Sequence, residues 1–172
     1  MKTRDLIILA LFIGIGAVLH AISPPFLFGM RPDTMLSMMF LGILLFPKVS
    51  YVLVLSVATG ALSALTTTMP GGQISNMVDK PITAFIFLGL FLLIRNVGKQ
   101  TIRAPILAAI GTIVSGSVFL GMVAALGLLP DAFTVLFVGV VLPAALFNII
   151  FIAVLYPILQ NIMKRTQQPA SI

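Results

Sequence analysis

Long apolar runs separated by short polar segments dominate the chain, and we interpret each run as a helix. The six runs cover Leu6–Ile22, Thr34–Phe46, Val49–Thr67, Ile82–Ile94, Ala104–Leu129 and Ala132–Met163. Most of them approach or exceed the roughly 20 residues that an α-helix needs to cross a bilayer. The second run is short and lies between Pro32 and Pro47. If it crosses, either neighbouring helices bury it or the segment 24–33 extends it; if it does not, only five helices cross.

Composition shows which solvent surrounds these helices. Of the 172 residues, 60% are hydrophobic and 8% are charged, whereas an ordinary soluble domain carries about 25% charged residues. A surface this apolar faces lipid, so we predict an all-α integral membrane protein. We expect one membrane domain over residues 1–165 and a disordered cytoplasmic tail over 166–172. The basic N-terminus also fits a cleaved signal peptide, but the apolar run after it is long enough to be the first span.

The charged residues predict how the helices are oriented, because lysine and arginine are concentrated in cytoplasmic loops. With six crossings and cytoplasmic termini, the inner side carries Lys2, Arg4, Lys48, Arg95, Lys99, Arg103, Lys164 and Arg165. The outer side then carries only Arg31 and Lys80, together with Asp33, Asp79 and Asp131. Five crossings would reverse this bias. We therefore predict six helices in the plasma membrane, both termini in the cytoplasm, and any ligand site at the outer end.

Several classes of function lack their usual sequence signals. The chain has no G-x-x-x-x-G-K-[ST] motif, so it does not hydrolyse ATP with a P-loop. It has no cysteine and one histidine, so we expect no disulfide and no Cys- or His-based metal site. Asp33 and Asp79 are the candidate acid–base pair, but both are expected to flank helix ends. We predict that the protein is not an enzyme and uses no metal or cofactor.

The segment "TTTMPGGQISNMVDK", residues 66–80, is the most polar interruption of the apolar pattern. Its Pro-Gly-Gly sequence indicates a turn, in which glycine permits a positive φ and a close approach by a partner. In one interpretation the segment only starts the fourth helix, with Asn76 or Asp79 as the cap and Pro81 in the first turn. In the other it also binds a ligand, through Gly72, Gln73, Asn76 and Asp79.

A zwitterionic ligand would suit the outer loops. Its carboxylate could meet Lys80, Arg31 or backbone N–H groups at a helix N-terminus, and its ammonium could meet Asp79 or Asp33. Asp33 also fits a simpler role as an N-cap that pairs with Arg31. His20, at the outer end of the first helix, is either an interfacial residue or a ligand contact.

Polar and soft residues within the spans give further candidates. Asn148 lies well inside the last span, where its amide needs a partner from another helix or from a ligand. Met35, Met38 and Met39 share one face of the second helix, where they either pack in the core or line an apolar site. Pro143 is expected to bend the last helix, because it removes a backbone donor.

Small residues form a stripe along the first helix. Ala10, Gly14, Ala17 and Ala21 recur at intervals of three or four residues, which lets another helix approach closely. The partner is either a helix of this chain or a separate membrane subunit.

With six predicted spans and this stripe, the chain resembles the S-components of bacterial energy-coupling factor (ECF) transporters. The segments "MRPDTMLSMMFLGILLFP" and "GGQISNMVDKPITAF" are similar to the tryptophan-specific members, the TrpP family. The resemblance covers nearly the whole chain and implies an S-component-like helical bundle. It also implies that the chain binds substrate from outside, while an ECF transmembrane subunit and two ATPase subunits energise uptake. In that pattern Ala10 and Gly14, with Ala17, dock the transmembrane subunit, and Arg31, Gln73, Asn76, Asp79 and Asn148 are candidates for the pocket.

We therefore predict a substrate-binding membrane subunit for tryptophan uptake. One alternative is an S-component for a vitamin or another aromatic compound. A second is a membrane assembly protein that binds no small molecule. A third, a carrier driven by an ion gradient, is disfavoured because we expect no acidic residue within a span.

Overall fold

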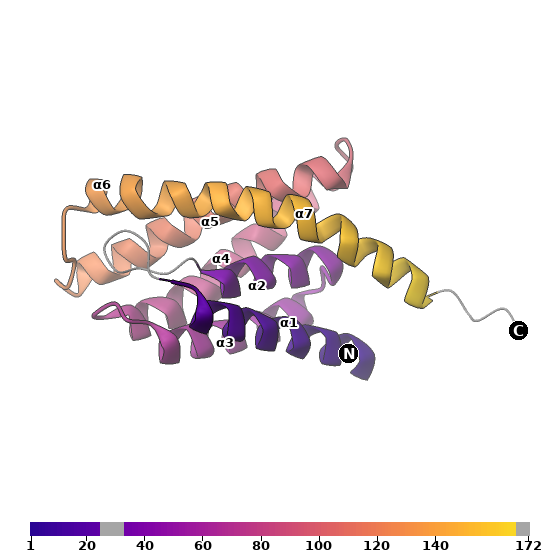
Figure 1. Ribbon diagram of the computed structural model, residues 1–172, viewed down its shortest axis with the longest axis horizontal. Coiled ribbons are helices and arrows are strands. Elements are labelled where there is room, and N and C mark those ends of the chain that lie inside the picture. Colours follow the sequence, from indigo (N-terminus) through magenta and orange to yellow (C-terminus); the bar gives the residue numbers. More distant parts are fainter. Residues whose placement is uncertain (25–32, 168–172) are drawn as a thin grey trace, which may run out of the picture.

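The computed structural model describes residues 1–24 and 33–167 as a bundle of helices that run roughly along one axis (Figure 1). The helices are α1 (Thr3–Ile22), α2 (Thr34–Leu45), α3 (Val49–Thr66), α4 (Gly72–Leu93), α5 (Gln100–Ala125), α6 (Phe133–Leu136), the π-helical turn η2 (Phe137–Val141) and α7 (Leu142–Gln167). Among the described residues, five helical segments are long and apolar enough to cross a membrane, counting α6 through α7 as one. The all-helical fold predicted from composition is confirmed for the described residues.

The short helix α2 lies at the centre of the bundle. Its residues Thr34–Leu44 are all buried, and it packs against α1, α3, α4, α5 and α7. Close approach depends on glycine: a Cβ added at Gly16 of α1 would lie 3.2 Å from the Met35 Cα, and one at Gly42 would lie 2.6 Å from Leu55. Burial by neighbouring helices is therefore what allows a helix of 12 residues here, and Met35, Met38 and Met39 pack in the core.

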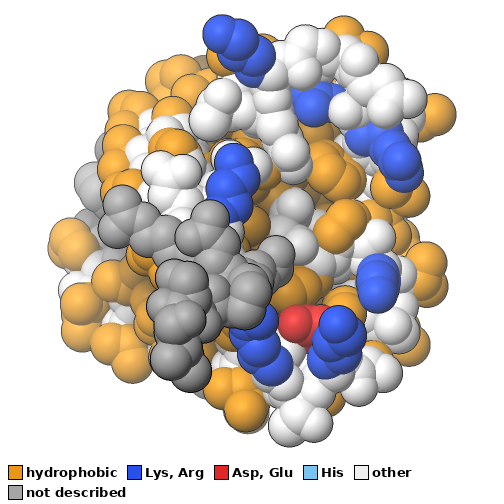
Figure 2. Space-filling view, turned by 90° about the vertical axis from the view of Figure 1, so that its right-hand side faces the viewer, with side chains coloured by type: hydrophobic (Ala, Val, Ile, Leu, Met, Phe, Trp, Pro, Cys, Tyr) orange, Lys and Arg blue, Asp and Glu red, His pale blue; other side chains and the backbone are white. Residues whose placement is uncertain are grey.

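Helices α1 and α3 begin at the same end of the bundle. The backbone N–H of Lys2 donates to the Tyr51 hydroxyl over 2.8 Å, and that hydroxyl donates to Asp5 Oδ2 over 2.7 Å. Helix α2 must therefore run back between them. Viewed from this end, lysine and arginine side chains surround the face, with little acidic surface among them (Figure 2). The structure thus gathers at one end the residues that charge counting assigned to one side of the membrane.

Helix α4 differs from the prediction, because it begins at Gly72 rather than near Ile82. Its N-cap is Gly71, whose φ of 72° uses the conformational freedom of glycine. The expectation that Asn76 or Asp79 caps this helix is wrong, and so is the placement of Pro81 in its first turn, since all three lie inside the helix. Asp79 is thus an acidic residue within a candidate span, which removes the reason for disfavouring an ion-driven carrier.

The last apolar run forms one long helical segment with a local change of register. The π-helical turn η2 directly precedes Pro143, which has no N–H to donate. A π-bulge of this kind accommodates an interrupted α-helical ladder. Helix α7 then continues to Gln167, so it includes the first two residues of the predicted tail, and positions 168–172 lie outside the described residues.

Candidate functional site

A cavity of about 140 Å³ opens at the end of the bundle opposite the basic face. It lies between the end of α1, the start of α2, the α3–α4 connection, α5 and η2. For comparison, an apolar cavity of about 150 Å³ in another protein binds benzene. The space is therefore suited to a small molecule with an aromatic ring.

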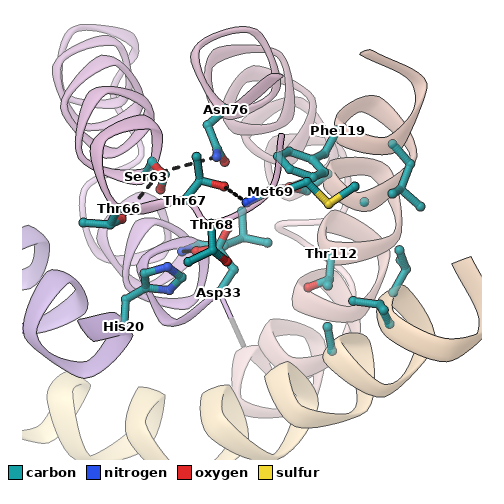
Figure 3. Close-up of a pocket in the computed structure, with 17 residues that line it drawn as sticks. His20, Asp33, Ser63, Thr66, Thr67, Thr68, Met69, Asn76, Thr112 and Phe119 are labelled. Atoms are coloured by element: carbon teal, nitrogen blue, oxygen red, sulfur yellow. Dashed lines mark hydrogen bonds between the residues drawn. The ribbon is translucent and has the colours of Figure 1, made fainter. Parts of the chain in front are cut away.

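Most of the polar side chains that line the cavity gather on one side of it, and Thr112 stands apart from them (Figure 3). They come from α1, the start of α2, the end of α3 with the loop after it, α4 and α5. The set is His20, Asp33, Ser63, Thr66, Thr67, Thr68, Asn76, Thr112 and Ser115. Figure 3 shows His20 and Asp33 close together, on the side of the cavity away from Phe119.

Apolar side chains form the rest of the wall. Phe119 and Leu120 come from α5, Val140 and Val141 from η2, and Met69 from the α3–α4 connection. Phe119 and Met69 lie together in Figure 3. An aromatic ring and a thioether are well suited to pack against another aromatic group. The cavity thus has one polar part and one apolar part, as an amphipathic ligand requires.

A buried charged network stands behind the polar part. Lys80 Nζ lies 2.5 Å from Asp33 Oδ2 and 2.9 Å from Asp79 Oδ2. Asp79, which is fully buried, also accepts hydrogen bonds from Thr83 Oγ1 and Ser115 Oγ, each at 2.7 Å. Charges so deep in a bundle are tolerated only when they are paired and hydrogen-bonded, and these side chains supply the partners.

Asp33 is the member of this network that lines the cavity. It caps α2, as predicted, by accepting a hydrogen bond of 2.9 Å from the Leu36 N–H. Burial alone would raise the pKa of the Asp33 carboxyl, but the Lys80 ammonium outweighs burial and holds that pKa below its usual value. Asp33 is therefore ionised at neutral pH. The alternative partner Arg31 lies outside the described residues.

A second buried network links three helices beside the cavity. Asn148 of α7 accepts a hydrogen bond from Ser37 of α2, and it donates to Thr112 Oγ1 of α5 over 2.7 Å. Thr112 lines the cavity and Asn148 does not. The predicted need of the Asn148 amide for a partner is thus met by two other helices.

The remaining predicted residues have different positions. His20 and Asn76 line the cavity, whereas Asp79 and Lys80 lie behind it and contact Asp33. Gln73 is exposed outside the cavity. Gly72 is buried, and its backbone leaves no room for a side chain beside Thr67.

Sequence reasoning named no individual residue of α5 for the cavity. Thr112, Ser115, Gly116, Phe119 and Leu120 line the cavity from this helix. Their spacing of i, i+3, i+4, i+7 and i+8 defines one helical face. Two hydroxyl residues on one stripe of an apolar span were the signal that could have identified it.

In the predicted stripe of α1, two small residues lie outside the contacts that this helix makes within the chain. Ala10 and Gly14 are exposed and Ala17 is half-buried, and a Cβ added at Gly14 would have no atom within 4 Å. Helix α1 instead contacts the bundle through Leu9, Phe12 and Gly16. Within residues 1–24 and 33–167, no three His, Cys, Asp or Glu side chains gather as a metal site would need.

Comparison with known proteins gives matches over nearly the whole chain. The chain is 55% identical to a "Probable tryptophan transport protein" of Bacillus subtilis (strain 168), over 96% of both chains. It is 41% identical to a protein of the same description from Clostridium acetobutylicum, over 90% of this chain and 93% of that one. No solved structure matches. The family described as "Tryptophan transporter TrpP" matches residues 2–164, and the chain therefore belongs to the TrpP family of tryptophan transporters.

Proposed function

We propose that this chain binds tryptophan in the cavity between α1, α2, α5 and η2 and carries it into the cell. The observation that supports this most directly is the division of the cavity into a polar and an apolar part. The indole ring would lie against Phe119, Met69 and the valines of η2. The amino-acid end would lie near Asp33, Asn76 and the threonines of the α3–α4 connection.

In the proposed orientation the basic end faces the cytoplasm and the cavity opens to the outside, following the positive-inside rule. All six predicted helices then cross the plasma membrane, with α2 as a buried short crossing. A tryptophan molecule would thus enter the cavity from outside the cell. Labelling of single cysteines, introduced at Asp131 and at Lys99, with a membrane-impermeant reagent in intact cells tests this: only the first should react.

We further propose that the energy comes from other subunits, namely an ECF transmembrane subunit and two ATPases. The chain has no P-loop of its own. The stripe of Ala10, Gly14 and Ala17, in which Ala10 and Gly14 are exposed, supports docking of a separate helix, since small residues permit close helix contacts in membranes.

Binding is tested with the purified chain in detergent and radiolabelled tryptophan. We expect saturable binding, competed by unlabelled tryptophan more strongly than by vitamins or leucine. Phe119→Ala should weaken it about tenfold, since one aromatic contact contributes ~0.5–1.5 kcal/mol beyond the buried area. Phe85→Ala is the matched control, because Phe85 is 39% exposed and lies outside the cavity. Wild-type affinity in Phe119→Ala would remove the indole from this wall.

Docking is tested by uptake in cells that contain the partner subunits. Gly14→Leu should keep tryptophan binding but lose uptake, because leucine would block a close helix contact. Gly89→Leu is the control, since Gly89 is also exposed and a Cβ there has no atom within 4 Å. Uptake by the purified chain alone in liposomes, driven by an ion gradient, would instead identify a stand-alone carrier.

A further inference from the structure

The polar groups around the cavity have already donated most of their hydrogen atoms to the protein. Four hydroxyl groups of the wall donate to a carbonyl, a sulfur or a carboxylate elsewhere in the chain: Ser63, Thr66, Thr112 and Ser115. A hydroxyl has one hydrogen and two lone pairs. What these four groups can still offer to a ligand is therefore the ability to accept a hydrogen bond.

Asn76 is limited in the same way. Its Nδ2 donates to the carbonyl oxygen of Gly72 over 2.9 Å and to that of Ser63 over 3.4 Å. Both amide hydrogens are thus engaged by backbone carbonyls. The group that Asn76 offers to the cavity is its acceptor, Oδ1.

The charge of the network formed by Asp33, Lys80 and Asp79 agrees with this pattern. Asp33 and Asp79 contribute two negative charges, and Lys80 between them contributes one positive charge, so the network has a net charge of −1. The Lys80 ammonium is 2% exposed and already pairs with both carboxylates. The net negative charge of these three residues favours a cationic ligand group beside Asp33, whose side chain is 28% exposed.

Asp33 is also held in place to receive one. Its Oδ1 accepts from the Leu36 N–H and its Oδ2 from Lys80. An ionised carboxylate has about four acceptor positions, and the hydrogen bonds from Leu36 and Lys80 take two of them. Because both oxygens are fixed by the protein, a ligand does not have to order this side chain, and that lowers the cost of binding.

We propose that this site selects ligands by their ammonium group, with Asp33 as the specificity-determining residue and Asn76 Oδ1 as a second acceptor. Lys80 and Asp79 are positioning residues, because they hold the Asp33 carboxylate and do not line the cavity. The proposal rests on the proposed function, and it adds that the amino group of tryptophan is required in its charged form. The carboxylate would meet the loop side, where Thr67 and Thr68 lie.

The test compares three ligands that share the indole ring. Tryptophan has both charged groups, tryptamine keeps only the ammonium, and indole-3-propionate keeps only the carboxylate. Their affinities are measured with the full chain in detergent by competition against radiolabelled tryptophan. We expect indole-3-propionate to bind about 10- to 100-fold more weakly than tryptophan, since a hydrogen bond to a charged group contributes at this level. Tryptamine should bind more tightly than indole-3-propionate.

The variant Asp33→Asn separates specificity from folding. Asparagine also caps helices well, so α2 keeps its N-cap. Tryptophan should bind at least tenfold more weakly to this variant, and the ratio between tryptophan and indole-3-propionate should fall towards one. Asp131→Asn is the matched control, because Asp131 is exposed and its hydrogen bond is to the adjacent N–H of Ala132. This control should keep the wild-type ratio.

The outcomes separate this inference from the function on which it rests. If the wild-type chain binds indole-3-propionate as tightly as tryptophan, the inference is wrong, while tryptophan binding still stands. This comparison needs no variant, so it decides the question even if Asp33→Asn misfolds. If Asp33→Asn keeps the wild-type ratio, Asp33 does not determine specificity. If tryptophan itself does not bind, the proposed function fails.

Discussion

Replacing Lys80 with methionine should destabilise the bundle more than any surface change, because Lys80 joins two carboxylates. Methionine has a similar length and no charge, so Lys80→Met removes the ammonium while keeping most of the packing volume. Asp33 and Asp79 would then face each other without a counter-ion. The network would change from a net charge of −1 to −2.

The size of the effect follows from the geometry. Lys80 Nζ is 2.5 Å from Asp33 Oδ2 and 2.9 Å from Asp79 Oδ2, so these oxygens are at most about 5.4 Å apart, the sum of the two distances. Two like charges at this separation repel by roughly 3 kcal/mol at an effective dielectric constant of 20. This agrees with the roughly 3–5 kcal/mol lost when one partner of a buried ion pair is removed.

The assay is thermal unfolding of the purified chain in one detergent. A loss of about 3 kcal/mol corresponds to a decrease of roughly 6–12 °C in Tm for a chain of this size. Lys99→Met, at an exposed lysine, should change the Tm by about 1 °C or less. Combining Lys80→Met with Asp79→Asn should recover part of the loss, because it removes the repulsion. A Tm within about 2 °C of wild type for Lys80→Met, or a further full decrease in the double variant, would refute this reasoning.

Two further predictions concern packing and the second polar network. Gly111→Ala should lower the free energy of unfolding by about 1–3 kcal/mol, because the new Cβ would lie 2.7 Å from Phe40 and 2.8 Å from Phe87. Gly121→Ala is the control in the same thermal assay. It should have little effect, because a Cβ at Gly121 would have no atom within 4 Å. Asn148→Leu should lower the Tm, since it removes the hydrogen bonds that join α7 to Ser37 of α2 and to Thr112 of α5. Tryptophan affinity, measured on the folded fraction, should change less than about threefold. A large loss of affinity at unchanged Tm would show that Asn148 contacts the ligand.

The apolar helices were predicted well from sequence alone, because most residues in each of them are apolar and can face either lipid or the protein core. Val49–Thr67 was predicted and α3 spans Val49–Thr66; Thr34–Phe46 was predicted and α2 spans Thr34–Leu45. The Asp33 cap was also predicted, since it depends on a local pattern of an aspartate directly before a helix. Such features require only neighbouring residues.

The start of α4 was missed because its first turns are polar for a tertiary reason. Polar residues inside a span suggest a loop unless other helices supply their partners, and the sequence does not show that α2 and α5 do so. The periodicity nevertheless indicated a helix. The positions i, i+3, i+4 and i+7 of one helical face are occupied by Asn76, Asp79, Lys80 and Thr83, and all four are buried. The cavity lies at the end opposite the basic face, but the pairing of Lys80 with Asp33 depends on packing between helices that are far apart in sequence.

The shortness of α2 explains where the cavity lies. A helix of 12 residues rises about 18 Å, whereas the apolar core of a bilayer is about 30 Å thick. The other helices continue past the start of α2, so a space remains above it, and Asp33 stands on its floor. Lys80 lies eight residues after the start of α4, or about 12 Å along that helix, which matches the length that α2 lacks. The charged network therefore lies where the short helix α2 begins. Its member Asp33 caps the first turn of α2 and forms the floor on which a ligand can bind.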